Sequence, residues 1–152
     1  MRIGLALREL HDAEVELVRT LLRTAEHHRS AHDVHHLALD LAAWSRRHLR
    51  ELAAVGGRYG VDLVQDQEPA HGRHAQEGEP DAGLLLLRDL REVHVRASEV
   101  SLDWELVAQA AQASADEGLL DLVRQCHPDT LRQLRWANAH LKDNAPQVLG
   151  GR

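Results

Sequence analysis

The strongest constraint on this fold is the helical spacing of apolar residues along segments that, apart from Pro128, lack glycine and proline. Residues 5–29 contain neither of these residue types, and their apolar side chains recur every three or four positions. The same spacing returns in residues 34–55, 86–112 and 119–141. Because this period places apolar side chains on one face of a helix, the sequence predicts an all-α protein with four long helices.

Polar residues before these segments suggest where the helices begin. Ser30 and Asp33 precede or open the second segment, and Asp81 precedes the third. Ser114 and Glu117 have the spacing of a capping box before the fourth. The side chains of such residues accept hydrogen bonds from the free N–H groups of a first helical turn. We therefore expect all of these residues to act at helix N-termini.

The breaks between the segments predict how the helices are connected. Residues 57–81 are rich in glycine, proline and polar residues and form a predicted crossover linker. An extended chain covers about 3.3 Å per residue, so this linker can reach from one end of a bundle to the other. Pro128 is expected to break the last helix, because proline lacks a backbone N–H. We expect one domain, residues 1–146, built as two antiparallel helical hairpins, with a flexible tail at residues 147–152.

Composition narrows the classes of function. The chain has 24 acidic and 18 basic residues and a formal net charge of −6, so a basic face for nucleic acid is not expected. No apolar run is long enough to predict a membrane span. A single cysteine, Cys126, excludes an intramolecular disulfide. We expect a cytoplasmic protein that binds neither nucleic acid nor membrane.

Two ionisable residues, Glu14 and His48, interrupt otherwise apolar helical stripes. Both lie about 17 residues from the first turn on either side of it, so they share one depth in a bundle. The same depth on the fourth helix falls beside His127 and Asp129. Because a buried ionisable group needs a partner, we expect a polar layer that crosses the bundle at this depth.

Two segments that contain this pair resemble a known family. Residues 9–14 read ELHDAE and residues 45–52 read SRRHLREL. Together with two hairpins and a long crossover, they resemble the ferritin-like superfamily, and most closely its stress-induced ferritin-like proteins of unassigned function. The resemblance covers residues 5–56 by motif and the remainder by architecture alone. It implies a ferritin-like four-helix bundle, a stress-associated role and a metal site.

The metal site implied by the resemblance departs from the family pattern. Glu14 matches the family's glutamate on the first helix, and His48 matches the histidine of a Glu-x-x-His motif on the second. Ser45 stands where that motif has its glutamate, and the fourth helix has no such motif. The expected ligands are Glu14 and His48 with His127 or Asp129. Such a degenerate site would hold one divalent ion, Fe, Mn or Zn, and is not expected to store iron.

A second interpretation needs no metal. Glu14 and His48 can satisfy each other by a buried hydrogen bond that also involves Ser45. The chain would then be a non-enzymatic helical interaction or dimerisation module, in which the polar layer sets helix register. The sequence leaves both interpretations open and favours a non-enzyme and a homo-oligomer in either case.

Two other features of the sequence are candidates for chemistry. Five histidines occur between residues 27 and 36, where His28 with His32, or His32 with His36, has the spacing of a helical metal pair. We interpret this group as a solvated turn with adventitious metal affinity. Cys126 and His127 are adjacent, and adjacent helical residues point about 100° apart, so we do not expect a catalytic pair.

Overall fold

A computed structural model of the protein describes residues 2–64 and 81–150. These residues form four long helices and one short 3₁₀ turn, and no strand occurs among them. The all-α, four-helix prediction is confirmed. None of the four helices has both the length and the apolar character needed to cross a bilayer. The elements are α1 (Ile3–His27), α2 (His32–Gly56), η1 (Gly57–Tyr59), α3 (Ala82–Ala113) and α4 (Glu117–Leu149).

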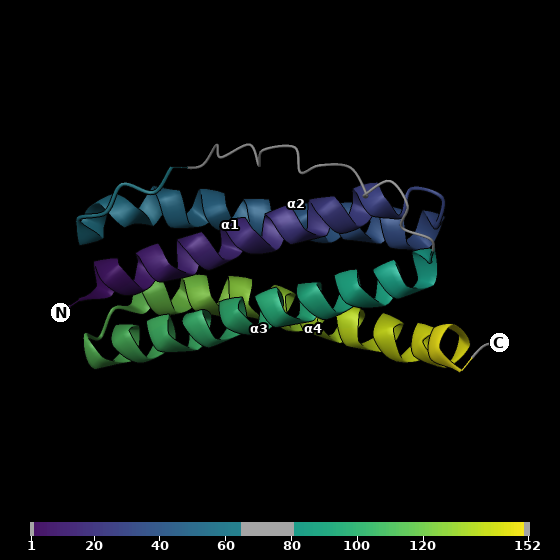
Figure 1. The fold of residues 1–152 in the computed structure, drawn as a ribbon. Coiled ribbons are helices and arrows are strands. Elements are labelled where there is room, and N and C mark those ends of the chain that lie inside the picture. Colours follow the sequence, from purple (N-terminus) through teal and green to yellow (C-terminus); the bar gives the residue numbers. More distant parts are fainter. Residues whose placement is uncertain (1, 65–80, 151–152) are drawn as a thin grey trace.

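The helices lie side by side and run the length of the molecule (Figure 1). In that view α1 and α4 run from left to right, and α2 and α3 run from right to left. Short turns connect α1 to α2 and α3 to α4. The connection from α2 to α3 therefore begins at one end of the bundle and finishes at the other. Residues 65–80 of the expected crossover lie outside the described residues.

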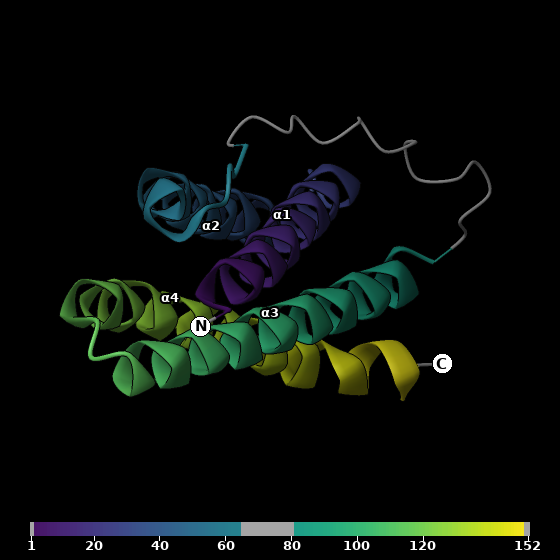
Figure 2. The ribbon, with the colours of Figure 1, turned by 90° about the vertical axis from the view of Figure 1, so that its left-hand side faces the viewer.

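The bundle has two layers, with α1 and α2 above α3 and α4 (Figure 2). The layers meet most extensively where α1 packs along α3, whereas α2 approaches α4 over a shorter stretch. Each fully buried leucine or valine in such a core contributes roughly 1.5–3 kcal/mol. The fully buried core side chains include Leu10, Leu17, Leu21, Leu52, Val93, Val100, Trp104, Val107 and Leu119.

The residues that cap the helices agree with the sequence at one position only. Asp81 accepts hydrogen bonds from the N–H groups of Gly83 and Leu84, as expected. At α4 the cap is Asp116, and Ser114 instead donates to a carbonyl of α3. The N-cap of α2 makes no side-chain hydrogen bond, so the expectation for Ser30 and Asp33 is wrong. The start of α2 is therefore set without a side-chain cap, whereas α4 is capped by a residue two positions beyond the expected one.

The expected break at Pro128 is wrong, because α4 continues through it without interruption. Pro128 lies on the exposed face of the helix, where the carbonyl that loses its N–H partner can meet water. Buried side chains on either side, Cys126 and Thr130, hold the flanking turns against the core. The helix also passes Pro146 and ends at Leu149, so the tail expected from residue 147 is helical at its start.

Tyr59 connects the end of the first hairpin to the start of the last helix. The chain leaves η1 through Gly60, whose φ of +77° lies in the left-handed region that glycine adopts without strain. The Tyr59 hydroxyl donates to the carboxylate of Asp116, which also caps α4. One aspartate thus fixes both the helix start and its distance from the first hairpin.

Candidate functional site

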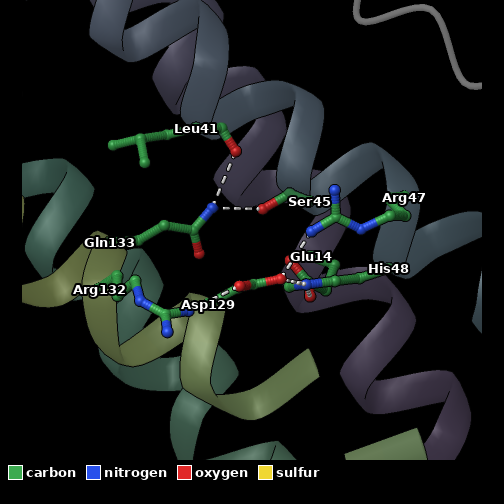
Figure 3. Close-up of polar contacts among 8 residues, drawn as sticks. All are labelled: Glu14, Leu41, Ser45, Arg47, His48, Asp129, Arg132 and Gln133. Carbon is green, nitrogen blue, oxygen red and sulfur yellow. Dashed lines mark hydrogen bonds and ion pairs between the residues drawn. The ribbon is translucent and has the colours of Figure 1, made fainter. Parts of the chain in front are cut away.

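The centre of the bundle contains the buried pair expected from the sequence. Glu14 lies midway along α1 and His48 lies on α2, and neither side chain is exposed to solvent. His48 Nδ1 donates to Glu14 Oε2 over 2.7 Å (Figure 3). This short contact is typical of a charge-assisted hydrogen bond. The second carboxylate oxygen, Glu14 Oε1, is buried and has no hydrogen-bond partner among the described residues.

The other nitrogen of the same ring contacts a second carboxylate. His48 Nε2 lies 3.1 Å from Asp129 Oδ2 on α4. An ionised carboxylate accepts and does not donate, so this geometry suits a ring with a proton on both nitrogens. Burial opposes the positive charge, but the hydrogen bonds and negative charges of Glu14 and Asp129 outweigh it and raise the pKa of His48 above 6.5. The two contacts and the direction of this pKa shift both favour the protonated form of His48 between the two carboxylates.

Asp129 also binds two arginines at the edge of the core. Arg47 donates to its Oδ2 over 2.7 Å, and Arg132 donates to its Oδ1 over 3.0 Å. Partial burial favours the neutral acid, but the hydrogen bonds from His48 and Arg47 hold the pKa of Asp129 below its ordinary value of 3.8. The carboxylate of Asp129 is thus ionised at neutral pH, and both of its oxygens have donors.

Ser45 belongs to a separate polar contact. The Gln133 side-chain amide on α4 donates to Ser45 Oγ and to the Leu41 carbonyl, both at 2.9 Å (Figure 3). No described hydrogen bond joins Ser45 to Glu14 or His48. Ser45, which stands where the resemblance implies a glutamate, therefore helps to pair α2 with α4 and does not complete the His48 contacts.

The third helix closes this centre with an aromatic ring. Trp104 of α3 is fully buried, and its ring centroid lies 5.9 Å from that of His48 at an interplanar angle of 89°. Such an edge-to-face contact places apolar surface against the imidazole ring. At this depth α3 thus contributes an indole and no carboxylate to His48.

His127, expected as an alternative ligand, faces another contact. Its Nε2 forms a 2.8 Å hydrogen bond with Ser101 Oγ on α3, and burial lowers the pKa of this histidine. Its neighbour Cys126 is also buried, which raises the pKa of the thiol to about 12. A thiol with this pKa is not a nucleophile at neutral pH. Of the four expected ligands, Glu14, His48 and Asp129 meet, and His127 does not join them.

The three residues that meet do not fit the metal centre that the resemblance implies. Glu14 and Asp129 bind opposite nitrogens of one imidazole, so their oxygens do not converge on a common point. A bridged pair of metal ions needs carboxylates that lie between the ions, and Ser45 and Trp104 supply none. The arrangement can store and stabilise a proton on His48, but it does not form a cage for a cation.

A convergent group occurs at the C-terminal end of α1. His27 Nδ1 and His28 Nε2 each lie 2.8 Å from the same oxygen of Asp89 on α3. In the part of the chain that the structure describes, these are the only three ligating residues whose ligand atoms all lie within 4.8 Å of one another. The sequence interpretation missed Asp89. Its spacing of four residues from buried Val93 was the available signal that it lies on the core stripe of α3.

The remaining histidines near the first turn take other roles. His35 Nδ1 donates to the Ala25 carbonyl over 2.7 Å and so satisfies the last turn of α1. His32 and His36 are exposed and stack on each other with centroids 6.2 Å apart. Of the two pairs expected from helical spacing, only His28 belongs to the convergent group.

His11, inside the motif at residues 9–14, supports the chain beyond α2. Its Nε2 donates to the Val64 carbonyl over 2.8 Å. A groove of about 480 Å³ lies beside this contact, between α1 and residues 62–64. It includes Arg8, Asp12 and Arg19 and opens to solvent on the outside of α1. The groove does not reach the Glu14 and His48 pair.

Comparison with known proteins adds no assignment. No family model, no curated protein and no solved structure matches this chain. The resemblance of residues 9–14 and 45–52 to ferritin-like proteins therefore stays a prediction. The function has to be inferred from the geometry of the bundle itself.

Proposed function

We propose that this chain is a ferritin-like bundle that acts by binding a protein surface, and that its central site is structural. The observation that carries the proposal is the engagement of both nitrogens of His48. A histidine with two protonated nitrogens has no lone pair for a metal. The central layer then serves to connect α1, α2 and α4, as in the non-enzymatic interaction module expected from the sequence.

The ferritin-like part of this proposal rests on topology and on the central pair. The connection between α2 and α3 joins opposite ends of the bundle, as a crossover between two antiparallel hairpins requires. Glu14 and His48 also meet at mid-depth. We regard the substitution of the family glutamate by Ser45 as the change that removed the metal centre. A cytoplasmic location and a stress-associated role belong to the same proposal.

The outer face of α3 is the best surface for self-association. Leu102 is 60% exposed and Leu106 is 62% exposed, and they lie one turn apart. Val95 continues the same stripe two turns earlier. A helix of 32 residues is about 48 Å long, which suffices for a helix pair across a two-fold axis. We therefore propose a second copy of this chain as the partner.

The oligomeric state of variants tests this proposal. Wild-type protein is expected to be a dimer by light scattering coupled to size-exclusion chromatography. The double variant Leu102→Glu, Leu106→Glu places charges in the interface and is expected to be monomeric. Leu5→Glu is the matched control, because Leu5 is 56% exposed but lies on α1. A monomeric wild type, or equal dissociation by the control, contradicts the proposal.

A second candidate function is the binding of one divalent ion at the centre. It is favoured by Glu14 Oε1, a buried carboxylate oxygen without a partner among the described residues. Such an ion requires His48 to give up one of its two carboxylate contacts. Metal analysis of protein purified without a His tag decides between the two. Stoichiometric metal that remains in the Asp89→Asn variant but is lost in the double variant Glu14→Gln, His48→Gln favours an ion at the centre. An Asp89→Asn variant that contains no metal excludes this ion.

A further inference from the structure

The end of α1 brings two consecutive histidines onto one carboxylate. Within a helix, adjacent side chains point about 100° apart and would not meet. His27 is the last residue of α1, and His28 leaves the helix with φ −124° and ψ 41°. This change of backbone direction lets both rings reach Asp89 Oδ2, and their centroids lie 6.1 Å apart at 86°. The convergence thus depends on where the helix ends.

The surroundings of Asp89 leave its charge without a strong counterion. Asp89 and His28 are both buried. The described ion pairs of Asp89 involve only His27 and His28, and no described arginine or lysine pairs with it. Each imidazole needs only one N–H to make its contact, so the two rings can satisfy the oxygen without supplying a full charge. A desolvated carboxylate in this position is a strong ligand for a cation.

We infer that His27, His28 and Asp89 form a binding site for one divalent transition metal ion, of which Zn²⁺ fits best. Two imidazole nitrogens and one carboxylate oxygen are ligands that zinc accepts, and a water molecule would take the fourth position. Ligands at about 2.0–2.1 Å from zinc lie about 3.3 Å apart in a tetrahedron. The present contacts of 2.8 Å need to open by only about half an ångström. The ion would connect the C-terminus of α1 to α3.

This site is independent of the proposed function. It lies near the end of the bundle, whereas Glu14 and His48 lie at its middle, and it shares no residue with the outer face of α3. The most exposed histidines nearby, His32 and His36, provide an internal comparison. They have the spacing of a helical metal pair, but no buried carboxylate converges on them among the described residues. Adventitious binding would use that exposed pair, and the inferred site would not.

Titration of the full chain with zinc chloride, purified without a His tag and freed of metal, tests the inference. Isothermal calorimetry is expected to give one zinc per chain for wild type. Asp89→Asn is expected to weaken binding at least tenfold, since it removes the charged ligand. The matched control His32→Gln, His36→Gln is expected to bind like wild type, and so is Glu14→Gln. No stoichiometric zinc in wild type, or loss in the control with retention in Asp89→Asn, overturns the inference.

Two further measurements keep this test independent of folding. Circular dichroism with chelator present is expected to give the same helical content for Asp89→Asn and wild type. If Asp89→Asn does not fold, His27→Gln replaces it, because His27 is the most exposed of the three ligands. Cobalt chloride then provides a spectroscopic signature. Visible bands of tetrahedral Co²⁺ in wild type that are absent from the ligand variant support the site, and identical spectra contradict it.

Discussion

The middle of the bundle and its end near the first turn both bury imidazoles against carboxylates, but in opposite ratios. In the middle, a single imidazole, His48, lies between two carboxylates. At the end, a single carboxylate, Asp89, lies between two imidazoles. Both groups are buried and both connect helices distant in sequence. The same residue types are used, but the central group has an excess of acceptors and the end group an excess of donors.

For a metal site, the convergence of the ligand atoms on one point matters more than which residue types are present. The two carboxylates in the middle bind opposite nitrogens of one ring, which keeps their oxygens apart. The two rings at the end approach one oxygen, so their nitrogens share a small volume with it. The sequence motif predicted a metal site in the middle, where the carboxylates of Glu14 and Asp129 do not converge on one point. The convergent group has no family motif and depends on the end of a helix.

The largest expected effect is the loss of stability when His48 is removed. His48→Ala leaves the Glu14 carboxylate buried without its partner and opens a cavity beside Trp104. Breaking a buried ion pair in this way costs about 3–5 kcal/mol. Urea denaturation followed by circular dichroism measures the free energy of unfolding.

Arg47→Ala is the matched control for that variant. Arg47 contacts the same oxygen of Asp129 but from solvent, so its loss should cost about 0–1 kcal/mol. If His48→Ala destabilises the protein no more than Arg47→Ala does, the centre is not the stabilising group inferred from the geometry.

A smaller effect is expected at the end of the bundle without metal. Asp89→Asn keeps one side-chain oxygen that can accept from an imidazole, and it removes the buried charge. With chelator present, the free energy of unfolding should fall by about 1–2 kcal/mol, the cost of a weakened buried hydrogen bond. A loss of stability as large as that of His48→Ala would show that the group around Asp89 is also held together as a buried ion pair.

The smallest expected effect is a dependence of stability on pH that comes from His48. Its pKa is raised on folding, so its contribution is fully present below pH 6.5 and declines as the pH rises through the folded pKa. The free energy of unfolding of wild type should therefore decrease more than that of His48→Gln on moving from pH 6 to alkaline pH. Parallel curves for the two proteins would contradict the raised pKa.

The sequence predicted the contacts of His48 in the middle of the bundle better than those of Asp89 at the end of α1, for a physical reason. Glu14 and His48 interrupt long apolar stripes, so their burial follows from helical period alone, and depth counting placed Asp129 beside them. His27 and Asp89 are 62 residues apart, and their contact depends on how far α1 extends before it ends. Helix ends are where local sequence signals compete with packing, as the uncapped start of α2 also illustrates.

The remaining errors share this origin. Pro128 is a strong local signal for a break, but packing of the turns on both sides of it maintains α4. Ser114 has the spacing of a capping box, but Asp116 lies closer to the actual start of the helix. The edge-to-face contact of Trp104 with His48 depends on the rotation of α3 about its own axis. Apolar periodicity does not define that rotation precisely enough to predict the contact. Local chemistry predicted the elements, and tertiary contacts decided their ends and faces.

The most direct test of the contrast between the two groups is the protonation of each imidazole, measured by long-range ¹H–¹⁵N spectroscopy with and without zinc. At neutral pH His48 is expected to show two protonated nitrogens, and one equivalent of zinc should leave its signals unchanged. The signals of His27 and His28 should shift on the same addition. A His48 with an unprotonated nitrogen that shifts with zinc, while His27 and His28 do not, would contradict the account.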